Sequence, residues 1–345
     1  MLAVATTACS PDGPSAYNTN GGQDQRAASA KAAAVPAIEE REYRGACDGS
    51  AAAMVSQTQF AAAYDEDNVI RIFPLSGGEA ISRLDAGQYL GIGDGESDLE
   101  AAARIGNRIY WISSMGRNDS GEEKPERRRF FATDIVGPAL LRPAGSQAEA
   151  AGDRLFRAIV ATPELQQYNL QAASQLPTKT VGGLNIEGLA PTADGGLILA
   201  FRAPLRPLDP AGDRRAIVVT LANPGDVIAG QAAQFINAGD IRLGDRGIRS
   251  LEYRPDTGDY LILAGAFDEE SRFALFRWTG RLADEPVQLD ADLDPLNPES
   301  LSLLSDGRLL VLSDDGEVQV DGRKCKSNRT PAERRSFRAR VIRLD

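Results

Sequence analysis

The chain has 345 residues, of which 42% are hydrophobic, so it can bury the core of one large domain or two ordinary ones. Its net charge of -11 argues against broad electrostatic capture of nucleic acid. It contains no histidine, which excludes Ser-His-Asp and Cys-His relays, His-ligated zinc and an imidazole general base. Any catalysis must therefore use carboxylates, Lys, Tyr, Arg or a metal held by oxygen ligands.

The N-terminus has features of an exported protein. Residues 1–9, MLAVATTAC, are similar to the end of a bacterial lipoprotein signal that lacks its basic start, with Cys9 as the lipidation site. Thr6 stands where such signals prefer Leu. Residues 10–36 are polar and rich in Gly, Ala and Ser, which predicts a disordered tether ahead of a single domain over 37–345. We expect a periplasmic or outer-surface protein anchored to the membrane by lipid alone; the alternative is a disordered cytoplasmic N-terminus.

The other two cysteines, Cys47 and Cys325, are the candidates for a disulfide. An oxidising envelope compartment would allow them to pair once Cys9 carries lipid. Because Cys325 lies in the sequence Lys-Cys-Lys, a free exposed thiol at this position fits the sequence equally well.

From residue 48 onward a unit of three pieces recurs five times. The first piece opens mostly on a polar or acidic residue and begins at Asp48, Asp98, Asn185, Arg249 and Asn297. The second is an apolar strand that begins at Gln59, Arg108, Gly196, Asp259 and Arg308. The third is another strand and begins at Asn68, Arg128, Arg215, Arg272 and Arg338. A fourth strand is expected over 79–85, 232–239 and 286–292.

The two ends of the repeat predict how the fold closes. A spare strand-like stretch, residues 39–46, precedes the first unit, and the last unit has no fourth strand because the chain ends. This arrangement is typical of a β-propeller whose two termini complete one blade. We therefore predict an all-β fold, a five-bladed β-propeller closed by an N-terminal strand. A double β-sandwich is the competing architecture.

One interval between units is much longer than the others and bears on the number of blades. It contains residues 146–176, which have helical periodicity, and Thr162-Pro163-Glu164 is a good helix start. We interpret this stretch as a helical insertion. A six-bladed propeller remains the alternative.

Several of these motifs resemble the bacterial family called domain of unknown function 3616. The resemblance rests on CDGSAAAMV with DEDNVIRIF, SDLEAAARIGNRIYWISSMGR with PERRRFF, and LNIEGLA with FRAP, and it covers most of residues 48–345. It implies a β-propeller-like fold, often exported, without a settled activity. Met115 follows Ser113-Ser114 where relatives often carry histidine, so no role of that histidine transfers. The element Asn-x-Glu-Gly-Leu-Ala at Asn185 is also similar to the esterase-like domain of phytase family.

In a propeller the first strand of each blade lines the central channel, and the residues just ahead of it share a face with the loops between second and third strands. This geometry gathers at one end of the channel the blade openings Asp48, Asp98, Glu100, Asn185, Glu187, Glu252, Asn297 and Glu299. The loops bring to the same face Asp65, Glu66, Asp67, Arg117, Arg202, Asp268, Asp314 and Asp315.

This ring of acids has three possible uses. Carboxylate and amide oxygens suit Ca²⁺, which takes about six to eight of them, and the predicted ligands are Asp98, Glu100, Asn185, Glu187, Asn297 and Glu299. Glu187 and Glu100 are candidates for a general acid and base, and Arg202, Arg117 and Asp314 for ligand binding. Alternatively, the acids accept backbone N–H groups of the next blade and only tie blades together.

The sequence thus predicts a monomeric cell-envelope β-propeller that binds a small molecule or an envelope polymer at the acid-lined mouth of its channel, with Ca²⁺ as the candidate cofactor and no nucleic-acid partner. A metal-assisted phospho- or carboxyl-ester hydrolase and a non-catalytic protein-interaction scaffold are the alternatives. Ser113 and Ser114 lack both a histidine and a Gly-x-Ser-x-Gly elbow, so a serine hydrolase is not expected. Whether the chain is an enzyme stays open.

Overall fold

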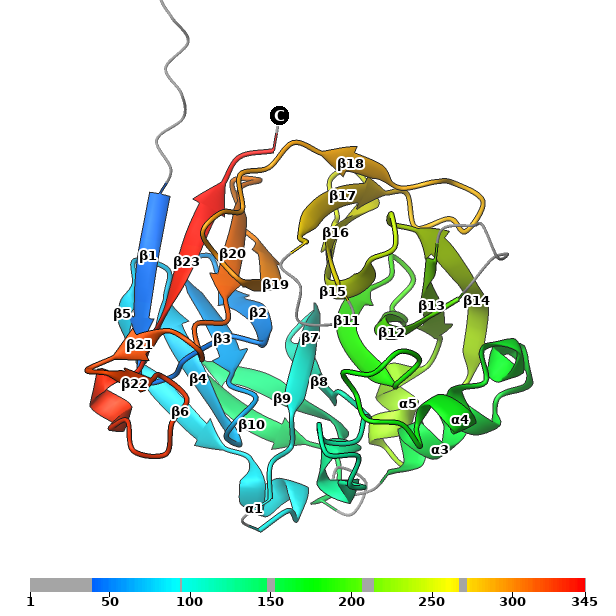
Figure 1. The fold of residues 1–345 in the computed structure, drawn as a ribbon, viewed down its shortest axis with the longest axis horizontal. Helices are drawn as coiled ribbons and strands as arrows, with labels where there is room; N and C mark the ends of the chain where they lie inside the picture. The colour runs from blue at the N-terminus through cyan, green and yellow to red at the C-terminus, as the bar shows by residue number, and fades with distance from the viewer. Residues whose placement is uncertain (1–38, 94, 148–152, 207–213, 267–271, 345) are drawn as a thin grey trace, which may run out of the picture. The chain divides into compact units, whose positions relative to one another are not determined.

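A computed structural model describes residues 39–93, 95–147, 153–206, 214–266 and 272–344. The predicted signal remnant and tether, with Cys9, lie outside these residues. Five small sheets follow one another along the described part of the chain and form a ring (Figure 1), which confirms the five-bladed β-propeller. The innermost strands contact one another in turn and close the circle, from β2 through β7, β11, β15 and β19 back to β2.

The strands of the blades, from the channel outward, have the following bounds. Blade 1 consists of β2 (Ala51–Ser56), β3 (Gln59–Ala63), β4 (Val69–Pro74) and β6 (Ser82–Asp85). Blade 2 consists of β7 (Leu99–Ile105), β8 (Arg108–Ser113), β9 (Phe130–Gly137) and β10 (Leu140–Ala144). Blade 3 consists of β11 (Asn185–Pro191), β12 (Leu197–Arg206), β13 (Arg215–Leu221) and β14 (Phe235–Arg242). Blade 4 consists of β15 (Gly247–Arg254), β16 (Asp259–Gly265), β17 (Ala274–Trp278) and β18 (Val287–Leu289).

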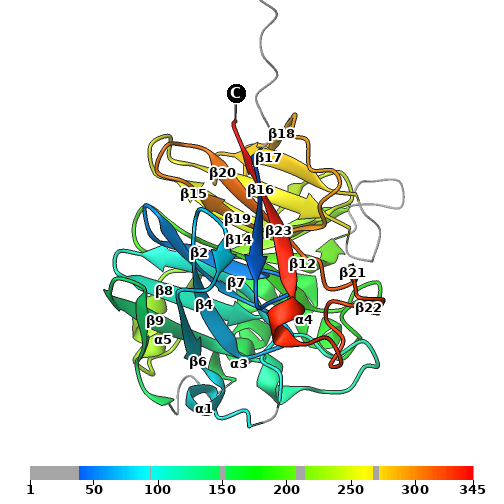
Figure 2. The same ribbon diagram turned by 90° about the vertical axis from the view of Figure 1, so that its left-hand side faces the viewer.

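Blade 5 joins the two ends of the described chain. It contains β19 (Pro298–Leu303), β20 (Leu309–Ser313) and β23 (Ser336–Ile342), and then β1 (Glu39–Arg44), with the short β5 (Gly78–Glu79) at its edge. β1 pairs antiparallel with β23, so Tyr43 lies opposite Phe337, and Figure 2 shows the two strands side by side. The predicted closure by an N-terminal strand is therefore confirmed.

A disulfide fastens the same junction. The sulfur atoms of Cys47 and Cys325 are bonded, and their Cα atoms are 5.7 Å apart. Cys47 lies between β1 and β2, and Cys325 follows the small hairpin of β21 (Gln319–Val320) and β22 (Arg323–Lys324). The bridge thus links the start of blade 1 to the long loop of blade 5.

The predicted helical insertion lies between β10 and β11. Its described part contains α3 (Arg154–Ala161), the 3-10 helix η2 (Pro163–Tyr168) and α4 (Leu170–Ala173). α3 buries Leu155, Phe156 and Ile159 against blades 2 and 3, which explains its apolar periodicity. Within the described residues the long interval therefore holds helices and no sixth blade. The fourth strand of blade 2, β10, was not predicted from the sequence.

The remaining helices are short: α1 (Gly87–Leu90), α5 (Pro224–Ile228), η1 (Pro125–Arg127) and η3 (Ala332–Arg334). No helix among the described residues is long and apolar enough to cross a membrane.

The hydrophobic core is divided among the junctions between blades. Each of five buried clusters fills the space between two neighbouring blades. The sheets of a propeller bury both faces in this way, so second strands such as β12 are apolar almost throughout. Turns between first and second strands need a left-handed residue, and Gly195, Gly258 and Gly307 supply it with φ of +89°, +71° and +81°. The rigid ring fixes one end of all five inner strands around the channel mouth.

Candidate functional site

The inner strands carry a β-bulge where they enter the channel mouth. In β7, β11, β15 and β19 the pairing with the second strand shifts by one residue near the start of the strand. The extra residues at these shifts are Glu100, Glu187, Arg249 and Glu299. A bulge re-aims a side chain out of the regular alternation, and here all four side chains line one cavity.

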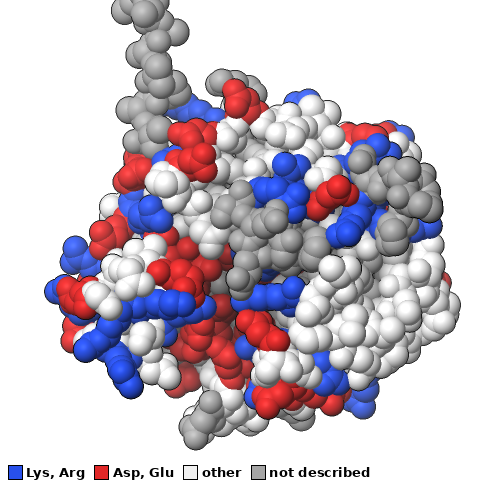
Figure 3. All heavy atoms as spheres, in the orientation of Figure 1, with Lys and Arg blue, Asp and Glu red and all other residues white. Residues whose placement is uncertain are grey.

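This cavity has a volume of about 1160 Å³. Figure 3 shows acidic side chains gathered near the middle of the ring on this face. Among the described residues that line it, eleven are Asp or Glu and seven are Lys or Arg. The cavity therefore carries an excess of negative charge and attracts cations.

Three of the bulge residues form a cluster with the spacing of a metal site. Oxygen atoms of Glu100, Glu187 and Glu299 all lie within 4.8 Å of one another. Ca²⁺ binds oxygens at about 2.3–2.6 Å, so two ligand oxygens on opposite sides of one ion lie about 4.6–5.2 Å apart. The spacing of the three glutamates therefore suits a single ion. Glu187 and Glu299 are 2% and 7% exposed, and Glu100 is half-buried.

Asn185 and Glu187 add acceptors that nothing in the described residues satisfies. The Asn185 amide nitrogen donates to Glu187 Oε1 at 2.6 Å, and Arg202 Nη1 donates to the same oxygen at 2.8 Å. Glu187 Oε2 and Asn185 Oδ1 are buried, and neither accepts a hydrogen bond from the described part of the chain. Since buried acceptors without partners are costly, both atoms are candidates for contacts with a bound group.

Burial and repulsion between the carboxylates raise pKa values in the cluster. Burial, followed by the charge of Glu187, raises the pKa of Glu100 well above its usual range. Burial also raises the pKa of Glu299 to about 7, although the neighbouring Arg249 opposes this shift. Both shifts mean that burial disfavours the charged forms of these carboxylates, and a bound cation would favour them.

The other predicted metal ligands lie beside this cluster and have partners. Asp98 pairs with Arg127 at 3.1 Å. The amide of Asn297 donates to Asp314 at 3.2 Å, and Asp314 also accepts the N–H of Gly316 at 2.8 Å. Asp98, Asn297 and Asp314 all line the cavity, so the predicted gathering of these residues at one rim is correct.

Arg117 was predicted to bind a ligand; the residues that follow it, Asn118 to Ser120, line the cavity, whereas its guanidinium bonds to the chain. Its guanidinium donates to the carbonyl oxygens of Ser174 and Gly121, each at 3.0 Å, and to the side chain of Gln175. It is not among the residues that line the cavity. Arg117 instead fastens the loop after β8 to the end of the helical insertion, where backbone carbonyls need donors.

Glu252 was also expected at the rim, and it lies farther along β15. It accepts the N–H of Leu303 from β19 at 3.0 Å. Glu252 thus ties blades 4 and 5 together, which is the role expected of an acid that accepts a backbone N–H group of the next blade. Asp67 pairs with Arg71 at 2.7 Å, and Asp48 accepts from Ser50, whereas Asp268 lies outside the described residues.

Arg249 is a site residue that was not predicted. Glu252 was expected to be the acid of that unit, whereas strand pairing aligns Ile248-Arg249-Ser250-Leu251 with Ile186-Glu187-Gly188-Leu189. The shared frame of an apolar residue, a charged residue, a small residue and Leu could have revealed this alignment. Arg249 pairs with Glu299, and its Nε lies 3.8 Å from Glu187 Oε2.

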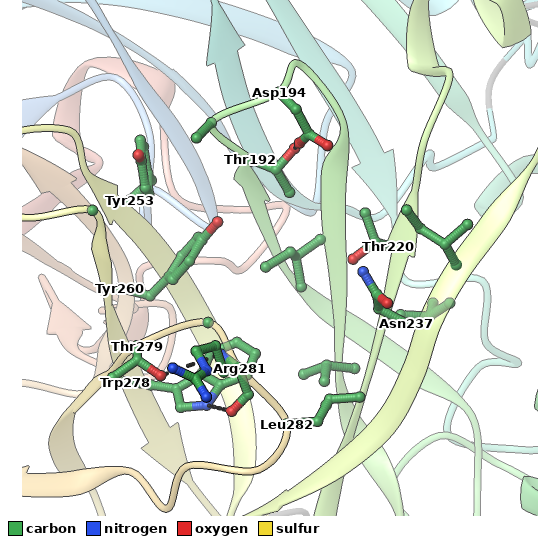
Figure 4. A pocket seen from close by; sticks show the side chains of 17 residues that line it. Thr192, Asp194, Thr220, Asn237, Tyr253, Tyr260, Trp278, Thr279, Arg281 and Leu282 are labelled. Carbon is green, nitrogen blue, oxygen red and sulfur yellow. Dashed lines mark hydrogen bonds between the residues drawn. The ribbon is translucent and has the colours of Figure 1, made fainter.

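A second, smaller cavity of about 220 Å³ lies at the other end of blades 3 and 4 (Figure 4). Its principal polar groups bond to each other or to nearby backbone. Trp278 Nε1 donates to Arg281 O at 3.0 Å, and the Tyr260 hydroxyl donates to Pro191 O at 3.2 Å. These polar groups are therefore less free to bind a ligand than those at the channel mouth.

No protein-family model matches the chain, and a comparison with curated proteins also finds no match. Among solved structures the chain is similar to a glutaminyl cyclase from Myxococcus xanthus, with a TM-score of 0.43, 11% identity and coverage of 89% of this chain and 96% of that one. It is also similar to a gluconolactonase from Xanthomonas campestris, with a TM-score of 0.39, 14% identity and coverage of 78% and 71%. At these TM-scores neither similarity supports a functional inference, and the fold rests on the strand pairing.

Proposed function

We propose that this protein binds a ligand at the channel mouth through a divalent cation, Ca²⁺. The cation would be held by the carboxylates of Glu100, Glu187 and Glu299 and by the amide oxygen of Asn185. The observation that carries the proposal is the meeting of three carboxylates within 4.8 Å beside two buried acceptors that lack partners.

The donor set favours Ca²⁺ over other biological cations. All four groups offer oxygen, the hard donor that Ca²⁺ and Mg²⁺ prefer, and the chain has no histidine. Mg²⁺ demands near-octahedral geometry at about 2.0–2.1 Å, whereas Ca²⁺ accepts irregular sites with longer bonds. A pocket about 1160 Å³ in volume leaves room for water and a ligand beside the ion.

Calorimetric titration with Ca²⁺ tests this proposal, with Glu100→Gln as the principal variant. Glu100 is half-buried and its pKa is already raised by burial, so the neutral amide should leave the fold intact. We expect Ca²⁺ at a hundred times its Kd to stabilise the protein by about 2.7 kcal/mol. Glu100→Gln should weaken binding at least tenfold without changing stability in chelator.

Glu317→Gln is the matched control. Glu317 also lines the cavity, but it pairs with Lys324 and Lys326 at the rim and is not part of the cluster. This variant should bind Ca²⁺ like the wild type. Absence of Ca²⁺ binding by the wild-type protein, or equal binding by Glu100→Gln, would overturn the proposal.

A metal-assisted phospho- or carboxyl-ester hydrolase is the second candidate function. The observation in its favour is that Glu299 lines the cavity beside Glu100 and Glu187 and that burial raises its pKa to about 7. In this alternative the cation would be held by Glu100, Glu187 and Asn185, and Glu299 would be the general base. Turnover of phosphate or carboxylate esters that disappears in Glu299→Gln, with Ca²⁺ affinity unchanged, would support it. If neither metal nor ligand binds, the acids serve to hold the blades together and a protein-interaction scaffold is favoured.

We also propose that the protein is exported to the cell envelope, anchored by lipid on Cys9 and monomeric. The disulfide between Cys47 and Cys325 supports an oxidising compartment. Membership of the domain of unknown function 3616 family stays a prediction from the motifs. Loss of membrane association in Cys9→Ser would support the anchor; unchanged association would contradict it.

A further inference from the structure

Blade 4 differs from the other blades at three positions around the channel mouth. Its bulge residue is Arg249, where blades 2, 3 and 5 have glutamate. Two residues earlier, Gly247 takes the place of Asp98, Asn185 and Asn297. At the end of the second strand, Gly265 aligns with Ser114, Arg202 and Asp314.

The two glycines make room for arginines. A Cβ on Gly265 would lie 2.5 Å from Cδ of Arg249, so only glycine lets the stem of Arg249 pass into the cavity. A Cβ on Gly247 would meet the backbone of Arg202 at 1.9 Å, and blades 3 and 4 therefore approach closely here. The three differences act together to place a guanidinium at the channel mouth.

The guanidinium of Arg249 is fixed in position. It is 7% exposed, pairs with Glu299, and lies over the ring of Phe273, with 5.5 Å between Cζ and the ring centroid. A stacked, paired arginine has lost its rotamer freedom before any ligand arrives, which lowers the entropy cost of binding.

Arg249 nevertheless has bonding capacity left. Its Nε is buried and donates no hydrogen bond within the described part of the chain. Glu187 Oε2 lies 3.8 Å from this nitrogen, beyond hydrogen-bond reach. An unused donor on a fixed, buried guanidinium that lines the cavity points to a ligand with an anionic oxygen.

We propose that Arg249 is the anion-binding group of this site, and that the ligand carries a carboxylate or phosphate bound between Arg249 and the cation. This inference rests on the proposed function for the cation alone. Charge within the cluster supports the pairing: three glutamates, one divalent cation, Arg202 and Arg249 sum to one positive charge, which favours a monoanionic group at this point of an otherwise acidic cavity. Without the cation, the same three carboxylates repel an anion. Cation and anion therefore bind with positive coupling.

Calorimetric titration with phenyl phosphate and with phenylacetate, each in the presence of Ca²⁺ or of EDTA, tests the inference. We expect one or both anions to bind with Ca²⁺ and at least tenfold more weakly in EDTA. The better ligand shows whether the anionic group is a phosphate or a carboxylate.

Arg249→Lys is the variant, because it keeps the charge that Glu299 needs and removes the fork of N–H donors. It should weaken anion binding about tenfold while Ca²⁺ binding is retained. Lys179→Gln is the control. Lys179 lines the same cavity and pairs with Asp119 at 3.0 Å, so its loss should leave anion affinity unchanged.

The outcomes separate the two proposals. Ca²⁺ binding without anion binding, or anion binding equal in Arg249→Lys and wild type, overturns the role of Arg249 and leaves the cation site standing. If anion binding requires Arg249 but is unaffected by Ca²⁺, Arg249 is still the anion-binding group, but the proposed coupling between anion and Ca²⁺ is wrong. If neither Ca²⁺ nor an anion binds, both proposals fail.

Discussion

Gly265 lies directly against the stem of Arg249, although the two residues belong to different strands of blade 4. A Cβ at position 265 would come within 2.5 Å of Arg249 Cδ and within 3.2 Å of Cγ and of the Phe273 ring. Because Gly265 has no Cβ, the guanidinium of Arg249 can lie where it faces the glutamate cluster.

Gly265→Ala should therefore destabilise the protein by about 1–3 kcal/mol, because the methyl group would collide with the stem of Arg249 and with the Phe273 ring. Urea unfolding measures the change. Gly137→Ala is the control, since the nearest atom to its Cβ is 4.0 Å away, and it should change stability by less than about 0.5 kcal/mol. Equal effects of the two substitutions would contradict the close approach at Gly265.

Glu187 and Arg202 should be strongly coupled. They form a buried pair at 2.8 Å, and removing either partner leaves the other charge buried without full compensation. A double-mutant cycle with Glu187→Leu and Arg202→Met should give a coupling of about 1–3 kcal/mol. The exposed pair of Arg334 and Asp321, also at 2.8 Å, should give less than about 1 kcal/mol.

Glu252 should make stability fall with rising pH. Burial raises its pKa from 4.5 to about 7, so the folded state holds this proton more tightly than the unfolded state between these two values. The stabilisation is complete below pH 4.5 and is lost as the pH rises through 7. Glu252→Gln keeps the acceptor for the Leu303 N–H and should be more stable than wild type at pH 8, by about 1–2 kcal/mol.

Unfolding of both proteins from pH 4 to pH 8 checks this expectation. Asp306→Asn is a suitable comparison, because the Arg308 partner lowers the pKa of Asp306 and places its titration below that window. Parallel pH profiles for the wild type and Glu252→Gln would show that Glu252 does not titrate there.

The Cys47–Cys325 bridge should contribute substantially to stability. It spans 278 residues, so it restricts the unfolded chain strongly, and removing such a bridge costs about 2–5 kcal/mol. Cys47→Ser with Cys325→Ser should lower the unfolding midpoint by a corresponding amount. Cys9→Ser, which removes a cysteine outside the bridge, should not. A midpoint insensitive to reductant in the wild type would contradict the disulfide.

The sequence predicted those parts of the site that depend on local pattern. Asn185 and Glu187 are two residues apart, so the spacing predicted that they share one side of the strand, and they are hydrogen-bonded, although the bulge in β11 sets the final direction of Glu187. The bonds that hold the Arg117 side chain could not be predicted, because its partners Ser174 and Gln175 depend on where the helical insertion folds back. No spacing in the sequence encodes that contact.

Repetition in the sequence was enough to predict the architecture of this protein, because five repeats of strand pieces, glycine at the turns and a spare N-terminal strand for the last blade are typical of a propeller closed through its two ends. Which rim residues meet depends on the tertiary structure. Bulges in four inner strands turn Glu100, Glu187, Arg249 and Glu299 toward one point, although the sequence separates the first from the last by almost two hundred residues. A bulge shifts the register by one residue, so its location depends on packing between blades and does not follow from periodicity alone.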